Sequence, residues 1–380
     1  MTPVPQSELV QIDITAAPKR LSRVATSFTT RCNLRCIYCP EGSHEETFYG
    51  DMTHERLQHI IELAKGSGAY IDISYYGDSA FNKNFGEYAA EIQEAGVGLA
   101  ITSNFARLLN DKEIAVVARC WAVAFSFETD DRDLAREVRK GLDLRTLVFN
   151  ILRVRAYCLR MAIPVPPFTL HAVLNDKTVN HLPNLVAFAA SMGVTAIGCN
   201  ELAEIKGATG GMVNVAALRG EELTRAISSI DEAARLSIRL GVPLNLSGEQ
   251  ILRIQAAAAG TLKDKVVREE REGIQGTYYL NAGDGALELK SGMTRSCLEP
   301  WIGPIVAPKG DVYSCCARGK VMGVAGPEEP LVDVYNNESF RALRRSLLTG
   351  QNLDFACRRC HIAPSTTPIE LQSKVIGLFA

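Results

Sequence analysis

Apolar runs alternate with amphipathic stretches through the first 200 residues of the chain. Runs rich in branched and aromatic residues predict strands at 23–29, 70–75, 98–103, 121–127, 168–174 and 195–200. Stretches with apolar residues at helical spacing predict helices at 54–65, 85–95, 112–118, 145–161 and 182–192. Thr53 and Asp111 stand where the first and third helices need an N-cap. Strands and helices that alternate at this spacing predict an α/β fold with a parallel sheet.

The second half of the chain departs from this alternation. A long helix is expected at about 218–240 and a short strand at 243–246, while the charged stretch 264–272 predicts an exposed helix or a linker. From about residue 275, glycines, cysteines and short apolar runs predict a smaller α+β domain. We therefore expect an N-terminal extension at 1–22, a core domain at 23–205, a helical connector at 206–274 and a C-terminal domain at 275–380.

Composition narrows the class of protein. The 380 residues suffice for one large and one smaller domain, and the formal net charge of −2 leaves no basic footprint for nucleic acid or a membrane surface. No apolar run approaches the ~20 residues that span a bilayer. The first 19 residues lack the basic start and apolar centre of a signal peptide. We expect a cytoplasmic protein, in which the eleven cysteines are metal ligands or free thiols rather than disulfides.

Three cysteines near the end of the first predicted strand form a C-x3-C-x2-C array, Cys32, Cys36 and Cys39. Thiolates are soft ligands that select iron–sulfur clusters, zinc or copper(I). No fourth ligand adjoins the motif, and an open coordination position is typical of a catalytic metal rather than a structural one. From the residues alone, half of a zinc site or three unrelated thiols remain alternatives.

A second group of cysteines lies toward the C-terminus: Cys297, Cys315, Cys316, Cys357 and Cys360. The C-x2-C pair that ends the group can grip one metal with two thiolates. A zinc ribbon formed by Cys297, Cys315, Cys357 and Cys360 is one interpretation, with Cys316 as a spare thiol. Cys120 and Cys158 fall among apolar residues on helical stretches, so we expect them in the core.

The first triplet, with Tyr38 just before its third cysteine, resembles the signature of the radical S-adenosylmethionine (radical SAM) enzymes. The resemblance implies a partial (β/α)6 TIM-like barrel with the cysteine loop at the carboxyl end of its first strand. It also implies a 4Fe–4S cluster whose free iron chelates S-adenosylmethionine, and whose reduced form cleaves that cofactor to a 5′-deoxyadenosyl radical. An external low-potential reductant, such as flavodoxin or ferredoxin, is implied as well.

The C-terminal cysteines resemble the short auxiliary-cluster module of this superfamily, the twitch domain. Its pattern is C-x12-G-x4-C followed by a distant C-x2-C, matched by Cys297, Gly310, Cys315, Cys357 and Cys360. The longer SPASM domain holds two clusters and needs further cysteines, and this chain has none after Cys360. The resemblance therefore implies one auxiliary 4Fe–4S cluster, closed by four thiolates and suited to electron transfer.

Residues at successive strand ends match the family's cofactor contacts. Gly77 and Asp78 correspond loosely to a Gly-Gly-Glu-Pro segment, and the Ser-x-Asp…Arg-Gly stretch corresponds to Ser126, Glu128 and Arg139, whose guanidinium could pair with the cofactor carboxylate. The predicted cofactor-binding residues are Tyr38, Gly77, Asp78, Ser103, Asn104, Ser126, Glu128 and Arg139. For each of these residues alone, a solvated strand end is the alternative.

The substrate is less constrained than the radical chemistry. Cys199 and Glu201 end the sixth strand and are candidate catalytic residues, although a buried core thiol is the simpler reading of Cys199; His171 and Asn175 could line a substrate pocket. We expect the oxidation of a small sugar or cyclitol in the biosynthesis of a specialised metabolite, with the auxiliary cluster as electron acceptor. The 22 residues before the first strand are too few for the recognition domain that many peptide-modifying relatives carry.

Three other functions remain open. They are modification of a ribosomal peptide by crosslinking or epimerisation, redox-neutral epimerisation or decarboxylation of a sugar, and a zinc-binding interaction module with an inactive barrel. The basic stretch with Arg341, Arg344 and Arg345 does not demand an acidic partner, because Asn337 as a cap and Gly350 as an end predict an amphipathic helix with a solvated basic face.

Overall fold

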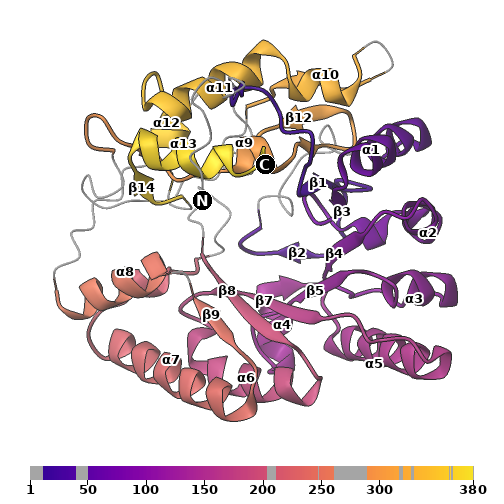
Figure 1. Cartoon of the computed structure of the whole chain (residues 1–380). Helices are drawn as coiled ribbons and strands as arrows, with labels where there is room; N and C mark the ends of the chain where they lie inside the picture. The colour runs from indigo at the N-terminus through magenta and orange to yellow at the C-terminus, as the bar shows by residue number, and fades with distance from the viewer. Residues whose placement is uncertain are drawn as a thin grey trace, which may run out of the picture.

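The computed structural model describes residues 12–39, 50–202, 211–246, 248–260, 289–315, 320–326, 329–358, 360 and 363–379. Its centre is a ten-stranded sheet in the order β13-β12-β11-β1-β3-β4-β5-β7-β8-β9. The sheet is curved, and helices cover its convex outer side (Figure 1). This arrangement confirms the predicted α/β partial barrel.

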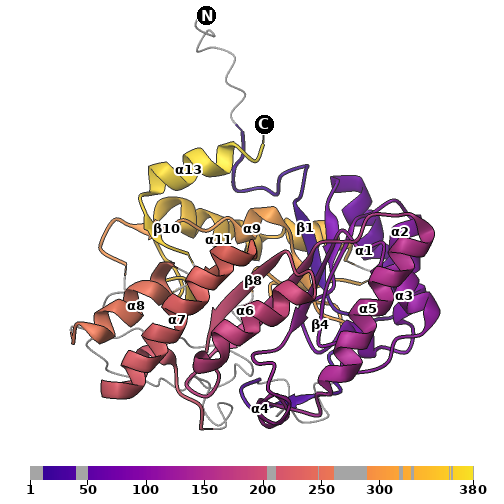
Figure 2. The same ribbon diagram turned by 90° about the horizontal axis from the view of Figure 1, so that it is seen from below.

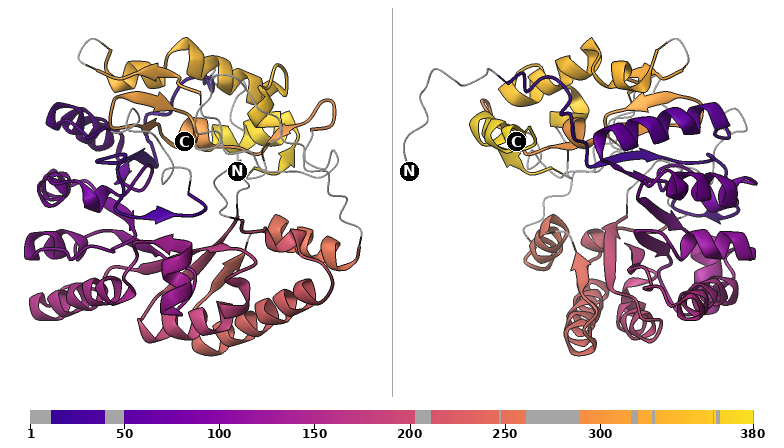
Figure 3. Two further views of the ribbon diagram at one scale, coloured as in Figure 1. Left: turned by 180° about the vertical axis from the view of Figure 1, so that it is seen from behind. Right: turned by 45° about the vertical axis from the view of Figure 1, so that its right-hand side comes forward.

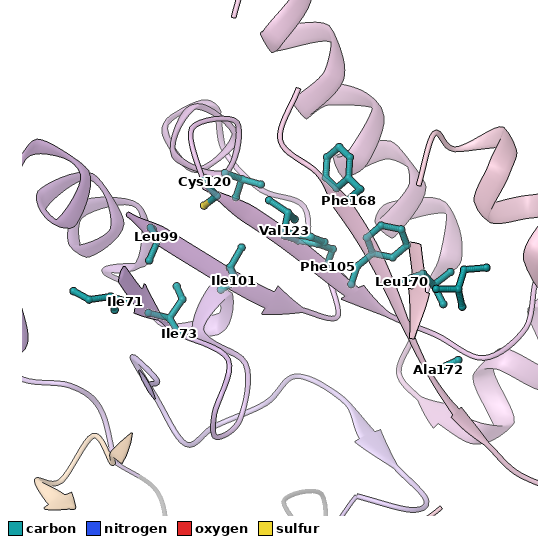
Figure 4. Close-up of a cluster of buried hydrophobic side chains, with 14 of the residues drawn as sticks. Ile71, Ile73, Leu99, Ile101, Phe105, Cys120, Val123, Phe168, Leu170 and Ala172 are labelled. Atoms are coloured by element: carbon teal, nitrogen blue, oxygen red, sulfur yellow. The ribbon is translucent and has the colours of Figure 1, made fainter. Parts of the chain in front are cut away.

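All six strands predicted for the core are present and pair in parallel in chain order. They are β1 (Arg23–Thr26), β3 (Tyr70–Asp72), β4 (Leu99–Ser103), β5 (Ala122–Ser126), β7 (Phe168–Leu174) and β8 (Ala196–Glu201). The five predicted helices are α1 (His54–Ser67), α2 (Phe85–Glu94), α3 (Asp111–Val117), α5 (Leu144–Met161) and α6 (Leu182–Ser191). Figure 4 shows the side chains of Leu99, Ile101 and Leu170 in the layer between strands and helices, where all three are buried.

One helix cap is as expected, whereas another cap and one short helix differ from expectation. Thr53 caps α1 as predicted, because its side chain accepts from the backbone N–H of Arg56. The prediction for Asp111 is wrong: Asn110 caps α3 in a capping box with Glu113, and Asp111 is already helical. A short helix, α4 (Arg132–Val138), and the two-residue β6 (Arg139–Lys140) lie between β5 and α5 and were not expected.

The sheet continues beyond the predicted core at both edges. β9 (Leu244–Leu246), the expected short strand, pairs in parallel with β8, and it lies between α7 (Gly220–Leu240) and α8 (Gly248–Ala258). At the other edge β11 (Ile305–Val306) pairs in parallel with β1, followed by antiparallel β12 (Asp311–Tyr313) and β13 (Gly323–Val324). Figures 1 and 3 show these C-terminal strands beside β1. The predicted helix or linker at 264–272 lies outside the described residues.

The remaining C-terminal elements are short. They are β10 (Thr294–Arg295), α9 (Glu299–Ile302), α10 (Leu331–Tyr335), α11 (Glu338–Thr349), α12 (Phe355–Arg358), β14 (Ser365–Thr366) and α13 (Pro368–Ile376). Asn337 caps α11 and Gly350 ends it, as predicted. The first described residues, drawn in indigo, lie near these helices (Figure 2), and Trp301 Nε1 donates to the carbonyl of Ile14 at 2.7 Å.

One charged side chain of α11 corrects the sequence prediction. Arg344 is fully buried instead of lying on a solvated face. Its guanidinium donates to the carbonyls of Pro300, Thr15 and Tyr335 at 2.9–3.1 Å. Arg344 lies four residues after Phe340 and four before Leu348, on the face that the buried residues occupy, so it is enclosed with them. No helix of the described part of the chain is long and apolar enough to cross a membrane.

Candidate metal and cofactor centre

The cysteine triplet lies in the loop that follows β1, at the carboxyl end of the parallel strands. Within it, β2 (Arg35–Cys36) pairs antiparallel with β6, which sets Cys36 opposite Arg139. The N–H of Ile37 donates to the carbonyl of Val138 at 3.0 Å, and the N–H of Cys39 donates to the carbonyl of Cys36 at 3.1 Å. Figure 1 shows β2 inside the curve of the sheet, the side on which chemistry is found in barrels of this kind.

Burial and neighbouring negative charge hold the Cys32 thiol in its protonated form. Burial raises the pKa of Cys32 to about 12, and the charges of Asp78, Cys36 and Cys39 add to the rise. Cys32 Sγ accepts from the backbone N–H of Leu34 at 3.4 Å and from Asn104 Nδ2 at 3.5 Å. Such donors stabilise sulfur ligands once a metal has displaced their protons. Within the described residues, no three His, Cys, Asp or Glu side chains are close enough together to hold a metal ion.

A second loop, after β3, packs against the cysteine loop. Gly77 has a φ of +52°, and a Cβ there would lie 2.4 Å from the carbonyl oxygen of Arg31, so only glycine fits. Asp78 N donates to the same oxygen at 2.8 Å. The buried Asp78 carboxylate accepts from Ser103 Oγ at 2.9 Å and from the N–H of Asn104 at 2.8 Å. Burial raises the pKa of Asp78, while these hydrogen bonds oppose that rise. Four predicted cofactor residues thus form one bonded unit beside Cys32.

A buried ion pair supports the other side of the cysteine loop. Arg139 Nη2 and Nε donate to the two oxygens of Glu128 at 2.6 and 2.8 Å, and Tyr38 Oη donates to Glu128 at 2.7 Å. Arg139 Nη1 lies 3.8 Å from Cys36 Sγ. Burial lowers the pKa of Arg139, but the charges of Glu128, Tyr38 and Cys36 and the Glu128 hydrogen bond together outweigh burial and raise this pKa well above its usual value. The guanidinium that was expected to face the cofactor carboxylate is therefore bidentate to Glu128 in this structure.

The inner face of the sheet carries polar side chains. Along β7 the residues alternate between buried on the helix side and half-buried on the inner face, where His171 lies. The register places Ser126, His171 and Gly198 in one row across β5, β7 and β8. Burial lowers the pKa of His171, and the nearby Asp72 carboxylate opposes this. A Cβ at Gly198 would lie 3.3 Å from His171 Cδ2, so the glycine leaves room for the ring.

The other candidate residues lie away from this inner face or have structural partners. Cys199 is buried in the main apolar core, on the face of β8 that Ile197 also occupies. Asn214 Nδ2 donates to Glu201 at 3.0 Å. The buried Asn175 shapes the turn after β7, because its side-chain oxygen accepts from the N–H groups of Lys177 and Thr178. Cys120 and Cys158 are buried as expected.

The C-terminal thiols come from segments far apart in the sequence. Cys297 follows β10, Cys315 follows β12, and Cys357 lies on α12 just before Cys360. Burial raises the pKa of Cys297 to about 12, and the Cys315 and Cys360 thiols contribute to that rise, which places the three thiols in one neighbourhood. The N–H of Ala363 donates to Cys360 Sγ at 3.4 Å. None of the ten described cysteines is in a disulfide. Cys316 lies outside the described residues.

Sequence reasoning missed two groups around these sites. Asp72 occupies the inner face near His171, and Arg295 contacts the C-x2-C segment through its guanidinium. Neither residue belongs to a sequence motif, because the pairing of the strands sets the position of each. The available signal in the sequence was a polar residue within an apolar predicted strand, as Asp72 is within 70–75.

Comparison with known proteins agrees with this geometry. A model of the radical SAM superfamily matches residues 26–179, and a model of the SPASM family, an iron–sulfur cluster-binding domain, matches residues 297–361. Together they cover more than half of the chain. A radical SAM domain uses a 4Fe–4S cluster and S-adenosylmethionine, and a SPASM domain binds auxiliary iron–sulfur clusters. A search of curated proteins finds no match.

Solved structures show the same fold. Streptococcus suis SuiB bound to S-adenosylmethionine has 16% sequence identity and a TM-score of 0.58, over 86% of this chain and 68% of SuiB. anSMEcpe with bound AdoMet has 13% identity and a TM-score of 0.56, over 94% of this chain and 96% of that one. SuiB has also been solved with its precursor peptide SuiA, and anSMEcpe with the peptide Cp18Cys. At these identities the likeness establishes the fold.

Proposed function

The chain belongs to the radical SAM superfamily, and its residues 297–361 match the SPASM iron–sulfur model while the cysteines there suffice for one auxiliary cluster. On this basis we propose that it oxidises a hydroxylated small molecule of the sugar or cyclitol type. With both clusters and S-adenosylmethionine bound, the enzyme would generate a 5′-deoxyadenosyl radical, remove a substrate hydrogen atom and pass one substrate electron to the auxiliary cluster. The observation that carries the proposal is the second cysteine set. Its four thiols can close a cluster to substrate and so leave it electron transfer as its role.

Residues of the chain fill definite roles in this proposal. Cys32, Cys36 and Cys39 would hold the first cluster, and Cys297, Cys315, Cys357 and Cys360 the second. The unit formed by Gly77, Asp78, Ser103 and Asn104 would shape the cofactor site, with Tyr38, Ser126, Glu128 and Arg139 on its other side.

The inner face of the barrel would receive the substrate. Asp72 and His171 are half-buried polar groups there, and both can hydrogen-bond to a hydroxyl. A neutral imidazole, which burial of His171 favours, can accept a hydroxyl proton when the adjacent carbon is oxidised. This is the reason for preferring a hydroxylated substrate.

The cellular setting belongs to the same proposal. Free thiols and iron–sulfur clusters require a reducing compartment, so we place the enzyme in the cytoplasm, where flavodoxin or ferredoxin would supply electrons. We assign the reaction to the biosynthesis of a specialised metabolite. We propose the same four parts, an extension, a barrel, a connector and an auxiliary-cluster domain. The large sheet runs through the barrel, the connector and the auxiliary-cluster domain.

Modification of a peptide is the second candidate function. It is favoured by the two structurally similar proteins solved with peptides, SuiB with SuiA and anSMEcpe with Cp18Cys. In that case the inner face of the barrel would bind one side chain of a longer substrate, and the product would be a crosslinked or otherwise altered peptide.

Iron content tests the two clusters first. After anaerobic reconstitution the intact chain should hold about eight irons, and a Cys32/Cys36/Cys39→Ala variant about four, as two four-iron clusters require. Zinc retained at the C-terminal set in place of iron would refute the oxidative proposal. A chain without iron in either form would refute the enzyme assignment.

Substrate class is tested by 5′-deoxyadenosine formation. Sugars and cyclitols should stimulate its release above the substrate-free rate and should yield a ketone in equal amount. Stimulation by serine- or cysteine-containing peptides alone would move the assignment to the peptide-modifying function.

A further inference from the structure

The segment that precedes Cys297 is tied to the segment that contains the C-x2-C pair. β10 and β14 pair antiparallel, with Thr294 opposite Thr366 and Arg295 opposite Ser365. The N–H of Ser296 extends the ladder by donating to the carbonyl of Pro364 at 2.8 Å. Since Cys297 follows one strand and Cys360 precedes the other, this small sheet brings two of the four proposed ligands together.

Arg295 reinforces this junction from within. Its side chain is buried, with 4% of the residue exposed. Nε donates to the carbonyl of Cys357 at 3.2 Å, Nη2 to the carbonyl of Arg358 at 2.5 Å, and Nη1 to the carbonyl of Ala363 at 3.3 Å. One planar group therefore holds the backbone on both sides of Cys360.

The acceptors explain why a guanidinium suits this position. Cys357 and Arg358 end α12, and the last carbonyls of a helix lack partners within it and carry partial negative charge. A guanidinium presents several donors in a fixed plane, whereas a lysine ammonium is a compact point charge on a flexible stem. Three carbonyls in different directions can be reached by the first group in one conformation.

We propose that Arg295 is a positioning residue for the auxiliary cluster, which holds the C-x2-C segment against Cys297 and places a buried positive charge beside the cluster. The inference rests on the proposed auxiliary cluster. Reduction adds negative charge to an iron–sulfur cluster, and nearby charge and burial set its potential. A positive charge at Arg295 favours the reduced form, as an electron acceptor requires.

The test uses the full chain in the Cys32/Cys36/Cys39→Ala background, so that iron and spectroscopic signals arise from the auxiliary site alone. Arg295→Met removes both the charge and the donors, and Arg295→Lys keeps the charge. Arg358→Met is the matched control, because it removes a charge from the exposed side chain of the same segment. Iron content and a redox titration followed by electron paramagnetic resonance are measured for each.

We expect Arg295→Met to lose more than half of its iron. The cluster that remains should be harder to reduce by about tenfold in the equilibrium, about 59 mV for a one-electron couple. Arg295→Lys should keep the reduction equilibrium within about threefold of the parent because it keeps the charge, but it should lose iron because an ammonium cannot reach all three carbonyls. Arg358→Met should match the parent in both measurements.

Three outcomes would overturn the proposal. They are an Arg295→Met variant that matches the parent in iron and potential, an Arg295→Lys variant shifted as far as Arg295→Met, and an Arg358→Met variant with the same shift. If Arg295→Met fails to fold, the Arg295→Lys variant still tests the proposal. A tenfold shift of its reduction equilibrium would contradict the role of the positive charge. A background chain that binds no iron refutes the auxiliary cluster itself and is thereby distinguished from a failure of Arg295.

Discussion

The two cysteine sites are built in opposite ways. The three thiols of the barrel site come from one eight-residue segment, Cys32 to Cys39, so a local loop is enough to gather them. The C-terminal site draws on three segments between Cys297 and Cys360, which the β10–β14 ladder and the strands beside β1 bring near one another. Both sets have a recognisable spacing, but the first is assembled by one loop, whereas the second is assembled only when the fold is complete.

Their buried charges differ as well. Beside the barrel site, the Arg139 guanidinium has a carboxylate partner in Glu128. In the C-terminal region, the guanidinium groups of Arg295 and Arg344 donate to backbone carbonyls. In the first case the acceptor is itself charged, whereas the carbonyl acceptors are neutral.

Removing the C-terminal ligands should have the largest effect. A Cys357→Ala/Cys360→Ala variant should retain about four irons and still release 5′-deoxyadenosine, because the barrel site is independent of it. Oxidised product should fall by at least about 100-fold, since the substrate electron has no acceptor. Product and 5′-deoxyadenosine are quantified from the same anaerobic reaction. Product at the parental level would erase the functional difference between the two sites.

Breaking the ion pair of the barrel site should have the second-largest effect, on stability. Glu128→Gln leaves the Arg139 charge buried without its carboxylate, which typically costs about 3–5 kcal/mol of unfolding free energy. The control is Glu137→Gln, which breaks the surface pair of Glu137 with Lys177 and should cost about 0–1 kcal/mol. Both are measured by urea unfolding. Equal losses in the two variants would show that the buried pair contributes no more than a surface pair.

Removing the Arg344 guanidinium, which donates to carbonyls, should cost less unfolding free energy than breaking the ion pair. Arg344→Met leaves the carbonyls of Pro300, Thr15 and Tyr335 without this donor, and we expect a loss of about 1–3 kcal/mol. Arg345→Met, on the same helix but at an exposed pair with Glu338, should change stability by less than about 0.5 kcal/mol. Thermal unfolding of both variants decides, and an Arg344→Met variant as stable as the parent contradicts the argument.

The smallest expected effect concerns pH. Because the pKa of His171 is lowered from 6.5 in the folded protein, the unfolded chain binds a proton there that the folded chain does not. The contribution of His171 to the free energy of unfolding is therefore fully present above about pH 6.5 and declines as the pH falls below that value. His171→Gln should flatten that part of the stability curve between pH 5 and 7, measured by urea midpoints. An unchanged slope would mean that His171 does not contribute to it.

The sequence was informative where the signal is local. The strands from Arg23 to Asn200 follow from short apolar runs between turn residues, and the Cys32–Cys39 spacing is complete within one loop. The limits of helix α11 were also predictable, because Asn337 and Gly350 are strong end signals that depend on few neighbours.

What escaped the sequence depends on contacts between distant segments. The buried state of Arg344 is set by three carbonyls from other elements, so an amphipathic pattern assigned it to solvent. The approach of Asp72 to His171 depends on how the strands curve, and Asn110 caps α3 only because Glu113 completes the box. The roles of these residues follow from tertiary structure rather than spacing.

The parallel pairing of β1 with β11 has a consequence for synthesis on the ribosome. Ala25 and Thr26 are made early, while their partners Ile305 and Val306 emerge about 280 positions later. Until then the outer edge of β1 offers unpaired backbone groups, a template for pairing with another chain. Parallel pairing over such a separation is also slow. The nascent enzyme therefore passes through a stage in which a chaperone bound at that edge would compete with aggregation. Chains that stop before β11 would keep this edge of β1 unpaired.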